Sequence, residues 1–234
     1  MKKDIDMVSA YCEEVLQLDN ATLPDEYFYQ SLPLCIIDAV YSIGVKYSHV
    51  QKAVSAYCTY VKMNKIRVDS DTPNISDQES VDSFCARQEE VSPQQMAEDV
   101  YTNRQRTSPT NGILKAEAVL LFAQYLQKYG VNYFQDLHMV MNNAQFEKDI
   151  RSIKGQGSGI SLQYFWMLSG SENLIKPDRM VVRFLSKALS RDVKLHEAQS
   201  LLEVVSNKLK TSYPNINPRL LDYKIWEFQR EQAV

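Results

Sequence analysis

The chain has few of the residues that mark disulfide scaffolds, zinc sites or membrane spans. Its 234 residues include four cysteines and three histidines. The cysteines are far apart without Cys-x-x-Cys spacing, and no histidine has a second ligand three or four residues away, so no zinc site is predicted. We expect the cysteines to be reduced and buried. No apolar run is long enough to cross a bilayer and no signal peptide opens the chain, which predicts a cytoplasmic protein without membrane association.

Acidic residues are concentrated in one stretch. Between Asp69 and Asp99 there are nine acidic residues and one basic residue, a local charge of −8. The whole chain carries −3, so the remainder carries +5. That remainder is compatible with a DNA partner, although an excess of this size is also common on proteins that bind no polyanion. The acidic stretch is expected to solvate the surface.

Apolar residues recur at helical spacing along most of the chain, and no alternating strand pattern extends beyond a few residues. We therefore predict an all-α fold. The predicted helices cover residues 7–18, 32–41, 50–63, 94–104, 113–129, 180–189 and 196–209, with a last helix beginning near 217 and two shorter segments at 133–141 and 146–153. Ser48 and Ser92 are placed to cap the helices at 50–63 and 94–104, and Gly130 to end the helix at 113–129.

Three of the seven glycines lie two residues apart between two helical runs, at Gly155, Gly157 and Gly159. A Gly-x-Gly segment interrupts a helix and turns main-chain N–H groups outward with no Cβ in the way. The helix expected from Ile160 adds its own unpaired N-terminal donors, so the hairpin suits an anion such as a phosphate. Glycine pairs at helix starts also occur as plain turns, and that alternative stays open.

The run from Ile153 to Ser161, Ile-Lys-Gly-Gln-Gly-Ser-Gly-Ile-Ser, and the segment at 177–183 together resemble the helix-hairpin-helix DNA glycosylase superfamily. In that family, whose best-known branch is endonuclease III, a Leu-Pro-Gly-Val-Gly hairpin precedes a Val-Asp-x-x-Ile/Val-x-Arg segment with the catalytic aspartate. Asp178 falls on that aspartate. The run Asn111-Gly-Ile-Leu-Lys-Ala is similar to the family's Asn-x-x-Lys-Ala helix, which precedes the hairpin.

The resemblance implies a helix-hairpin-helix DNA glycosylase-like helical bundle and an organisation for the whole chain. Residues 1–234 would form a single all-α unit. Residues 30–64 and 111–190 would form its glycosylase-like core, and 67–110 an acidic and polar insertion. The helices of 194–234 would pack on the core.

By the same resemblance, Asp178 is the catalytic carboxylate; the alternative is an ordinary helix N-cap. The residues expected to bind the DNA backbone are Lys154, Gly155, Gln156, Gly157, Ser158 and Gly159. Family hairpins also bind a monovalent cation through main-chain carbonyls. No cysteine follows Cys85, so the iron–sulfur cluster of many endonuclease III-like enzymes is not expected, nor is any other cofactor. Bifunctional members have a lysine at the position of Gly159, so strand cleavage by β-elimination is not expected here.

In the family, a glutamine fills the gap that a flipped base leaves in the duplex. Gly44 stands at the corresponding position here, and it has no side chain that could fill the gap. Tyr41 and Tyr47 are candidates for that wedge, and Tyr164 and Trp166 for a stacking surface in a base pocket. Two alternatives remain for Arg104 and Arg106. They contact phosphates or line the base pocket, or they are ordinary surface arginines.

The leading hypothesis is a monofunctional DNA glycosylase that excises an altered base with the help of Asp178. It predicts base release with an abasic site left uncut. The alternative is a non-catalytic helix-hairpin-helix module that binds DNA within a repair or defence assembly. A third hypothesis is that the hairpin contacts protein and binds no nucleic acid.

Overall fold

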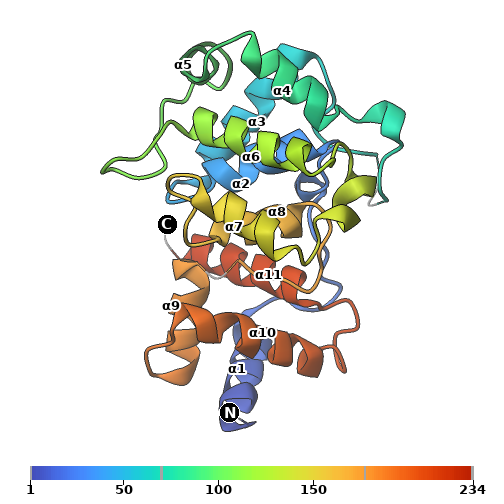
Figure 1. The fold of residues 1–234 in the computed structure, drawn as a ribbon. Helices are drawn as coiled ribbons and strands as arrows, with labels where there is room; N and C mark the ends of the chain where they lie inside the picture. The colour runs from blue at the N-terminus through green and yellow to red at the C-terminus, as the bar shows by residue number, and fades with distance from the viewer. Residues whose placement is uncertain (1, 69–70, 177, 233–234) are drawn as a thin grey trace. The chain divides into compact units, whose positions relative to one another are not determined.

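The computed structural model describes residues 2–68, 71–176 and 178–232, and all the secondary-structure elements named in this part of the chain are helices (Figure 1). Extended pairing in it is limited to two isolated antiparallel bridges, Tyr29 with Ile66 and Arg106 with Leu114. The predicted all-α class is therefore confirmed.

The chain forms two compact units, whereas the sequence predicts one. Unit 1 comprises Met1–Pro24 and Gly170–Val234, and unit 2 comprises Asp25–Ser169. The division arises because the N-terminal helix packs with the C-terminal helices, so the two ends of the chain share a core that the middle of the chain does not supply. This pairing joins segments far apart in sequence, and helical periodicity carries no information about it.

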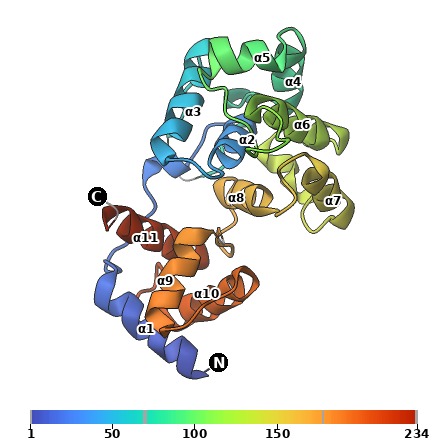
Figure 2. The same cartoon turned by 90° about the vertical axis from the view of Figure 1, so that its left-hand side faces the viewer.

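Unit 1 contains four helices: α1 (Lys2–Val15), α9 (Arg179–Leu189), α10 (Leu195–Leu209) and α11 (Pro218–Glu231). Helix α1 packs against α9 and α10, and α11 packs against both of these C-terminal helices (Figures 1 and 2). Their core includes Cys12, Phe184, Leu202 and Ile225, all fully buried. Each helix thus contributes one apolar face to a common core.

Unit 2 contains the remaining elements: η1 (Asp25–Tyr27), α2 (Leu32–Tyr41), α3 (Tyr47–Val61), η2 (Ile75–Asp77), α4 (Val81–Glu89), α5 (Pro93–Gln95), η3 (Met96–Val100), α6 (Lys115–Lys128), η4 (Phe134–Met139), α7 (Ala144–Ser152) and α8 (Ile160–Leu168). All ten residues of α2 are buried, because α3, α4, α6 and α8 pack around it. It is the central helix of the unit. Its almost continuous apolar sequence is what a helix enclosed on all sides requires.

Two of the three predicted helix boundaries are confirmed. Ser92 caps α5 in a capping box with Gln95, and Gly130 follows α6 with φ of 76°. The prediction for Ser48 is wrong, because α3 begins at Tyr47 with Lys46 at the N-cap, so Ser48 lies inside the first turn.

Residues 67–110, predicted as an acidic and polar insertion, also contribute buried residues to unit 2. Helix α4 packs against α6 and buries Val81, Phe84 and Cys85. Arg67 is also buried, with its guanidinium 5.3 Å from the ring centroids of Phe28 and Phe134. All four cysteines of the chain are buried and unpaired, as predicted. Burial raises the pKa of the Cys12 thiol to about 12, which leaves it unreactive at neutral pH.

Candidate functional site

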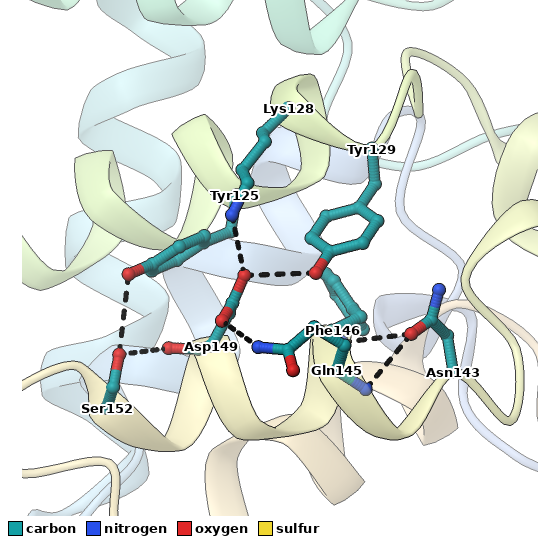
Figure 3. A network of polar contacts seen from close by, with 8 residues as sticks. All are labelled: Tyr125, Lys128, Tyr129, Asn143, Gln145, Phe146, Asp149 and Ser152. Atoms are coloured by element: carbon teal, nitrogen blue, oxygen red, sulfur yellow. Dashed lines mark hydrogen bonds and ion pairs between the residues drawn. The ribbon is translucent and has the colours of Figure 1, made fainter.

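Helix α7, which leads into the glycine hairpin, is fixed to α6 by a polar network (Figure 3). The carboxylate of Asp149 accepts hydrogen bonds from Lys128 Nζ at 2.8 Å, Tyr129 Oη at 3.0 Å and Gln145 Nε2 at 2.8 Å. The bond from Lys128, followed by that from Gln145, lowers the pKa of Asp149 below its usual value. The network fixes the helix, α7, from whose C-terminal end the hairpin begins.

The hairpin itself is a tight turn between α7 and α8. The Gln156 N–H donates to Ile153 O at 2.8 Å, and the Gly159 N–H donates to Gln156 O at 2.9 Å. Gly155 and Gly159 have φ values of 89° and 76°, in the region that glycine adopts without strain. Glycine is therefore required at these two positions by the turn itself.

The predicted phosphate-binding groups divide into those bonded within the turn and those with no acceptor among the described residues. The Gly159 N–H is occupied by Gln156 O, and the buried Gln156 side chain accepts a hydrogen bond from the Ser161 hydroxyl, so both residues maintain the turn. Gly157 and Ser158 are exposed, and neither main-chain N–H donates to an acceptor within the residues that the structure describes. These two N–H groups, like that of the exposed Gly155, are available to a phosphate.

Positive side chains flank those N–H groups. Lys154 is exposed, one residue before Gly155 in the turn. The guanidinium of Arg151 lies over Gly159, since a Cβ added there would be 2.6 Å from Arg151 Nη2. Both cations thus belong to the same hairpin as these N–H groups.

The loop that carries Arg104 and Arg106 packs on the hairpin. A Cβ added to Gly155 would be 2.4 Å from the Cβ of Thr107, so the loop and the turn are in direct contact there. The hairpin is therefore supported by α7 on one side and by the loop of residues 103–114 on another.

Both arginines of that loop have contacts within the protein. Arg106 Nε donates to Gly112 O at 2.9 Å and closes the loop on itself. Arg104 forms an ion pair with Glu98 at 3.2 Å, with 69% of its side chain exposed. Arg106 is thus part of the loop structure, and Arg104 is the more accessible of the two.

Tyr41 does not have the exposure that a wedge would need. It is fully buried in α2, with its ring centroid 5.3 Å from that of Tyr101. Phe165 is fully buried, and Trp166 is half-buried beside it and against Phe146. These tilted and edge-to-face contacts of Trp166 with core rings leave only one part of its surface exposed.

The structure places Tyr47 near a buried carboxylate that the sequence analysis did not single out, and Tyr164 near Tyr29, which bonds to that carboxylate. Asp38, fully buried in α2, accepts a hydrogen bond from Tyr29 Oη at 2.8 Å. Burial, and then the charge of Asp38, raise the pKa of Tyr47; burial and Asp38 also raise that of Tyr29, with a smaller contribution from Tyr164. The signal that could have revealed this cluster is a lone aspartate within the apolar run of 32–41.

Asp178 is the N-cap of α9, which confirms the prediction that it caps a helix. Its role as a catalytic carboxylate stays a prediction. Its Oδ1 accepts the N–H groups of Met180 at 2.8 Å and Val181 at 3.3 Å. Its Oδ2 has no hydrogen-bond partner within the described ranges, and the residue is half-buried. One carboxylate oxygen therefore remains available. Pro177, which precedes it, lies outside the described residues.

A second carboxylate lies near Asp178 and was missed. Asp222 of α11 is 8% exposed, and its Oδ1 accepts the N–H of Lys176 at 3.1 Å. Burial, followed by the charge of Asp178, raises the pKa of Asp222 to about 8. The sequence signal was its place on the apolar face of α11, between Leu221 and Ile225.

The hairpin belongs to unit 2, and the two aspartates belong to unit 1. In the described ranges no helix is long and apolar enough to span a membrane. The same residues contain no cluster of three or more histidine, cysteine, aspartate or glutamate side chains arranged to hold a metal ion.

Comparison with known proteins gives one family match. A family model described as "Domain of unknown function (DUF8548)" matches residues 6–230. Neither curated proteins nor solved structures gave a match.

Proposed function

Since the chain belongs to the DUF8548 family, a domain of unknown function, we propose its function from its own residues: it is a monofunctional DNA glycosylase of the helix-hairpin-helix type. The observation that carries the proposal is the pair of N–H groups at the exposed residues Gly157 and Ser158, which have no acceptor among the described residues and are flanked by the cations of Arg151 and Lys154. Main-chain N–H groups of this kind bind phosphate oxygens without reading base sequence.

The chemistry is proposed to reside at Asp178. Cleavage of an N-glycosidic bond builds oxocarbenium character on the sugar, and a nearby carboxylate stabilises that charge and orients or deprotonates the attacking water. Asp178 uses Oδ1 to cap α9, which fixes the carboxylate, and its Oδ2 is available for this role. Because Gly159 stands where bifunctional members have a lysine, the abasic product would remain uncut.

The remaining candidates take smaller parts in the proposal. Tyr47 is half-buried at the start of α3 and remains a candidate wedge, whereas the buried Tyr41 does not.

A monovalent cation would bind hairpin carbonyls. The oxygens of Ile153, Gln156 and Gly159 each accept one hydrogen bond within the protein, and a carbonyl has two lone pairs, so ligating capacity remains.

A base-release screen tests the proposed function. The protein is incubated with duplexes that carry different altered bases, and the strands are compared before and after hot alkali. A break that appears only after alkali identifies a monofunctional glycosylase and its substrate class. Breaks without alkali would contradict the absence of lyase chemistry, and no break with any duplex would contradict the glycosylase.

A negative charge introduced at the hairpin tests DNA binding separately. A Cβ at Gly157 would meet nothing closer than Arg151 O at 3.9 Å, so a side chain can be added there without a clash. Gly157→Glu places a negative charge beside these N–H groups, and we expect the Kd for duplex DNA to rise about tenfold or more at low salt.

Gly157→Gln is the matched control, because it has the same size without the charge. We expect its Kd to stay within about threefold of the unmutated protein, and both variants to keep the same Tm. Equal binding by the Glu and Gln variants in a fluorescence-anisotropy titration would show that the hairpin does not contact phosphates.

A second candidate function is a non-catalytic DNA-binding module. Two observations favour it. Asp178 has a structural role as a helix cap, which does not require it to be catalytic. Gly44 is exposed, with φ of 72°, and has no side chain that could fill the gap left by a flipped base. Salt-dependent DNA binding that Gly157→Glu weakens, together with no base release, would establish this module instead.

A further inference from the structure

Residues 39–68 form the longest stretch of the chain without an acidic residue. They supply α3 and the turns at both of its ends, and they contain four lysines and Arg67. Arg67 is buried, whereas Lys46, Lys52 and Lys62 are exposed and Lys65 is half-buried. The lysines therefore give the surface of this segment a positive charge that no carboxylate within the segment offsets.

The outer face of α3 is a continuous row of exposed polar residues, which we call the α3 row. They recur three or four positions apart, so they lie on one side of the helix: Ser48, Lys52, Ser55, Thr59 and Lys62. The apolar face of α3 is buried, and the helix packs against α2. At 1.5 Å per residue the row is about 21 Å long, and every side chain in it can donate a hydrogen bond.

A hollow of about 540 Å³ lies at the C-terminal end of the α3 row. Its lining comes from residues 55–65 and includes five polar side chains, those of Ser55, Thr59, Lys62, Asn64 and Lys65. None of the described lining residues is acidic. Among the described residues, the ammonium groups of Lys62 and Lys65 have no hydrogen-bond or ion-pair partner. The hollow thus presents two uncompensated cations and several neutral donors, a set that fits an anion.

The end of α3 opposes an anion only weakly. The last carbonyls of a helix together carry about half a negative charge. Part of their capacity is already used, because Cys58 O accepts the N–H groups of Lys62 and Met63. Two ammonium groups exceed this partial charge, so the hollow is positive overall.

Lys62 has a backbone conformation that favours glycine. Its φ is 58°, in the left-handed region, where a residue with a Cβ is strained and glycine is not. Capping of α3 alone would therefore be served better by glycine at this position. A ligand for the ammonium group gives lysine a reason to stand there.

The N-terminal end of α3 adjoins the loop that packs on the hairpin. His49 Nδ1 lies 3.5 Å from Gln105 Nε2, and Thr107 of the same loop is in contact with Gly155. The hairpin, the loop and α3 all belong to unit 2. One loop therefore connects the donors of the hairpin to the helix that carries the α3 row.

We propose that the α3 row and the hollow at its end bind phosphates of the same DNA molecule that the hairpin holds. The proposal rests on the proposed function, which supplies the DNA. A strand places one phosphate every 3.4 Å along the duplex axis, so roughly six phosphates span the length of the row. A regular polyanion matches such a row. A bilayer does not, because an interfacial helix needs an exposed apolar face and the apolar face of α3 is buried.

Lys62→Gln combined with Lys65→Gln removes both ammonium groups of the hollow. We expect the slope of log Kobs against log salt concentration for duplex DNA to become shallower by about two, one for each lysine. The Kd at low salt should rise about tenfold or more, and equally for duplexes of different sequence. Fluorescence-anisotropy titrations at several salt concentrations measure both effects.

Lys194→Gln combined with Lys210→Gln is the matched control, because it removes the same charge from two exposed lysines of unit 1. We expect its slope to stay close to that of the unmutated protein. An equal change of slope in the two double variants would reveal a general effect of net charge and would overturn the proposal.

Lys62→Gly separates binding from folding. Glycine relieves the left-handed strain at this position, so we expect an equal or higher Tm. The same variant should bind duplex DNA with a salt slope shallower by about one. A Gly variant with the Kd and slope of the unmutated protein would show that Lys62 contacts no phosphate.

The remaining outcomes distinguish the α3 row from the proposed function. If the lysine variants weaken DNA binding but no duplex releases a base, the glycosylase fails and the α3 row stands. If bases are released and the lysine variants keep the original slope, the α3 row fails and the glycosylase stands. In that second case, a Tm that inorganic phosphate raises at constant ionic strength only in the unmutated protein would assign the hollow to a free phosphate. Absence of salt-dependent DNA binding would overturn both proposals.

Discussion

Replacement of Asp178 by asparagine is expected to lower the single-turnover rate of base release by about a thousandfold or more while leaving the protein folded. The loss follows from removing the negative charge that stabilises the developing oxocarbenium ion and the attacking water. The fold is preserved because the Asn side-chain oxygen can accept the same N–H groups of Met180 and Val181, and asparagine caps helices as well as aspartate. The Tm should therefore stay within about 2 °C.

The control for this experiment is a variant that removes the cap along with the charge. Asp178→Ala should lose the same catalytic rate and also about 1 kcal/mol of stability, because two N–H groups of α9 lose their acceptor. Hot-alkali assays and calorimetry measure the two effects separately. An Asn variant that retains the rate would show that Asp178 is a cap without catalytic function.

The helices of this chain could be predicted because their apolar residues repeat at helical spacing. The run at 32–41 was predicted to the residue, and those at 180–189 and 196–209 to within one residue at their starts. These segments have strong local signals, since burial of one face, or of the whole helix for α2, dictates the sequence. Local patterning also identified the hairpin, where positive φ values at Gly155 and Gly159 require glycine.

The groups that complete the candidate site depend on contacts between distant segments, and sequence pattern does not reveal them. Asp222 lies 44 positions after Asp178 in sequence, and its partner Lys176 comes from a loop. Asp38 and Tyr29 likewise meet through the packing of α2 with the segment before it. Tyr41 was predicted as a candidate wedge because aromatic residues suit either a core or a stacking surface, and only packing distinguishes the two.

Replacement of Lys115 by methionine is expected to destabilise unit 2 by about 3 kcal/mol, the largest loss of stability that we predict. Lys115 is 2% exposed at the start of α6. Its Nζ donates to Tyr41 O at 2.8 Å, to Ile43 O at 2.9 Å and to Gln105 Oε1 at 3.3 Å. A cation at the C-terminal carbonyls of α2 also interacts favourably with the dipole of that helix. Methionine retains the apolar stem and leaves these buried oxygens without their donor.

Lys128→Met on the same helix is the matched control. The Lys128 side chain is 60% exposed in its ion pair with Asp149, and exposed pairs contribute little to stability because water solvates both charges. Calorimetry is the suitable measurement, because two units can unfold in separate transitions. We expect the transition of unit 2 to fall by roughly 10 °C for Lys115→Met and far less for Lys128→Met. Equal shifts would mean that the three bonds of Lys115 only replace hydration, and that apolar packing alone holds α2, α6 and the loop at 103–114 together.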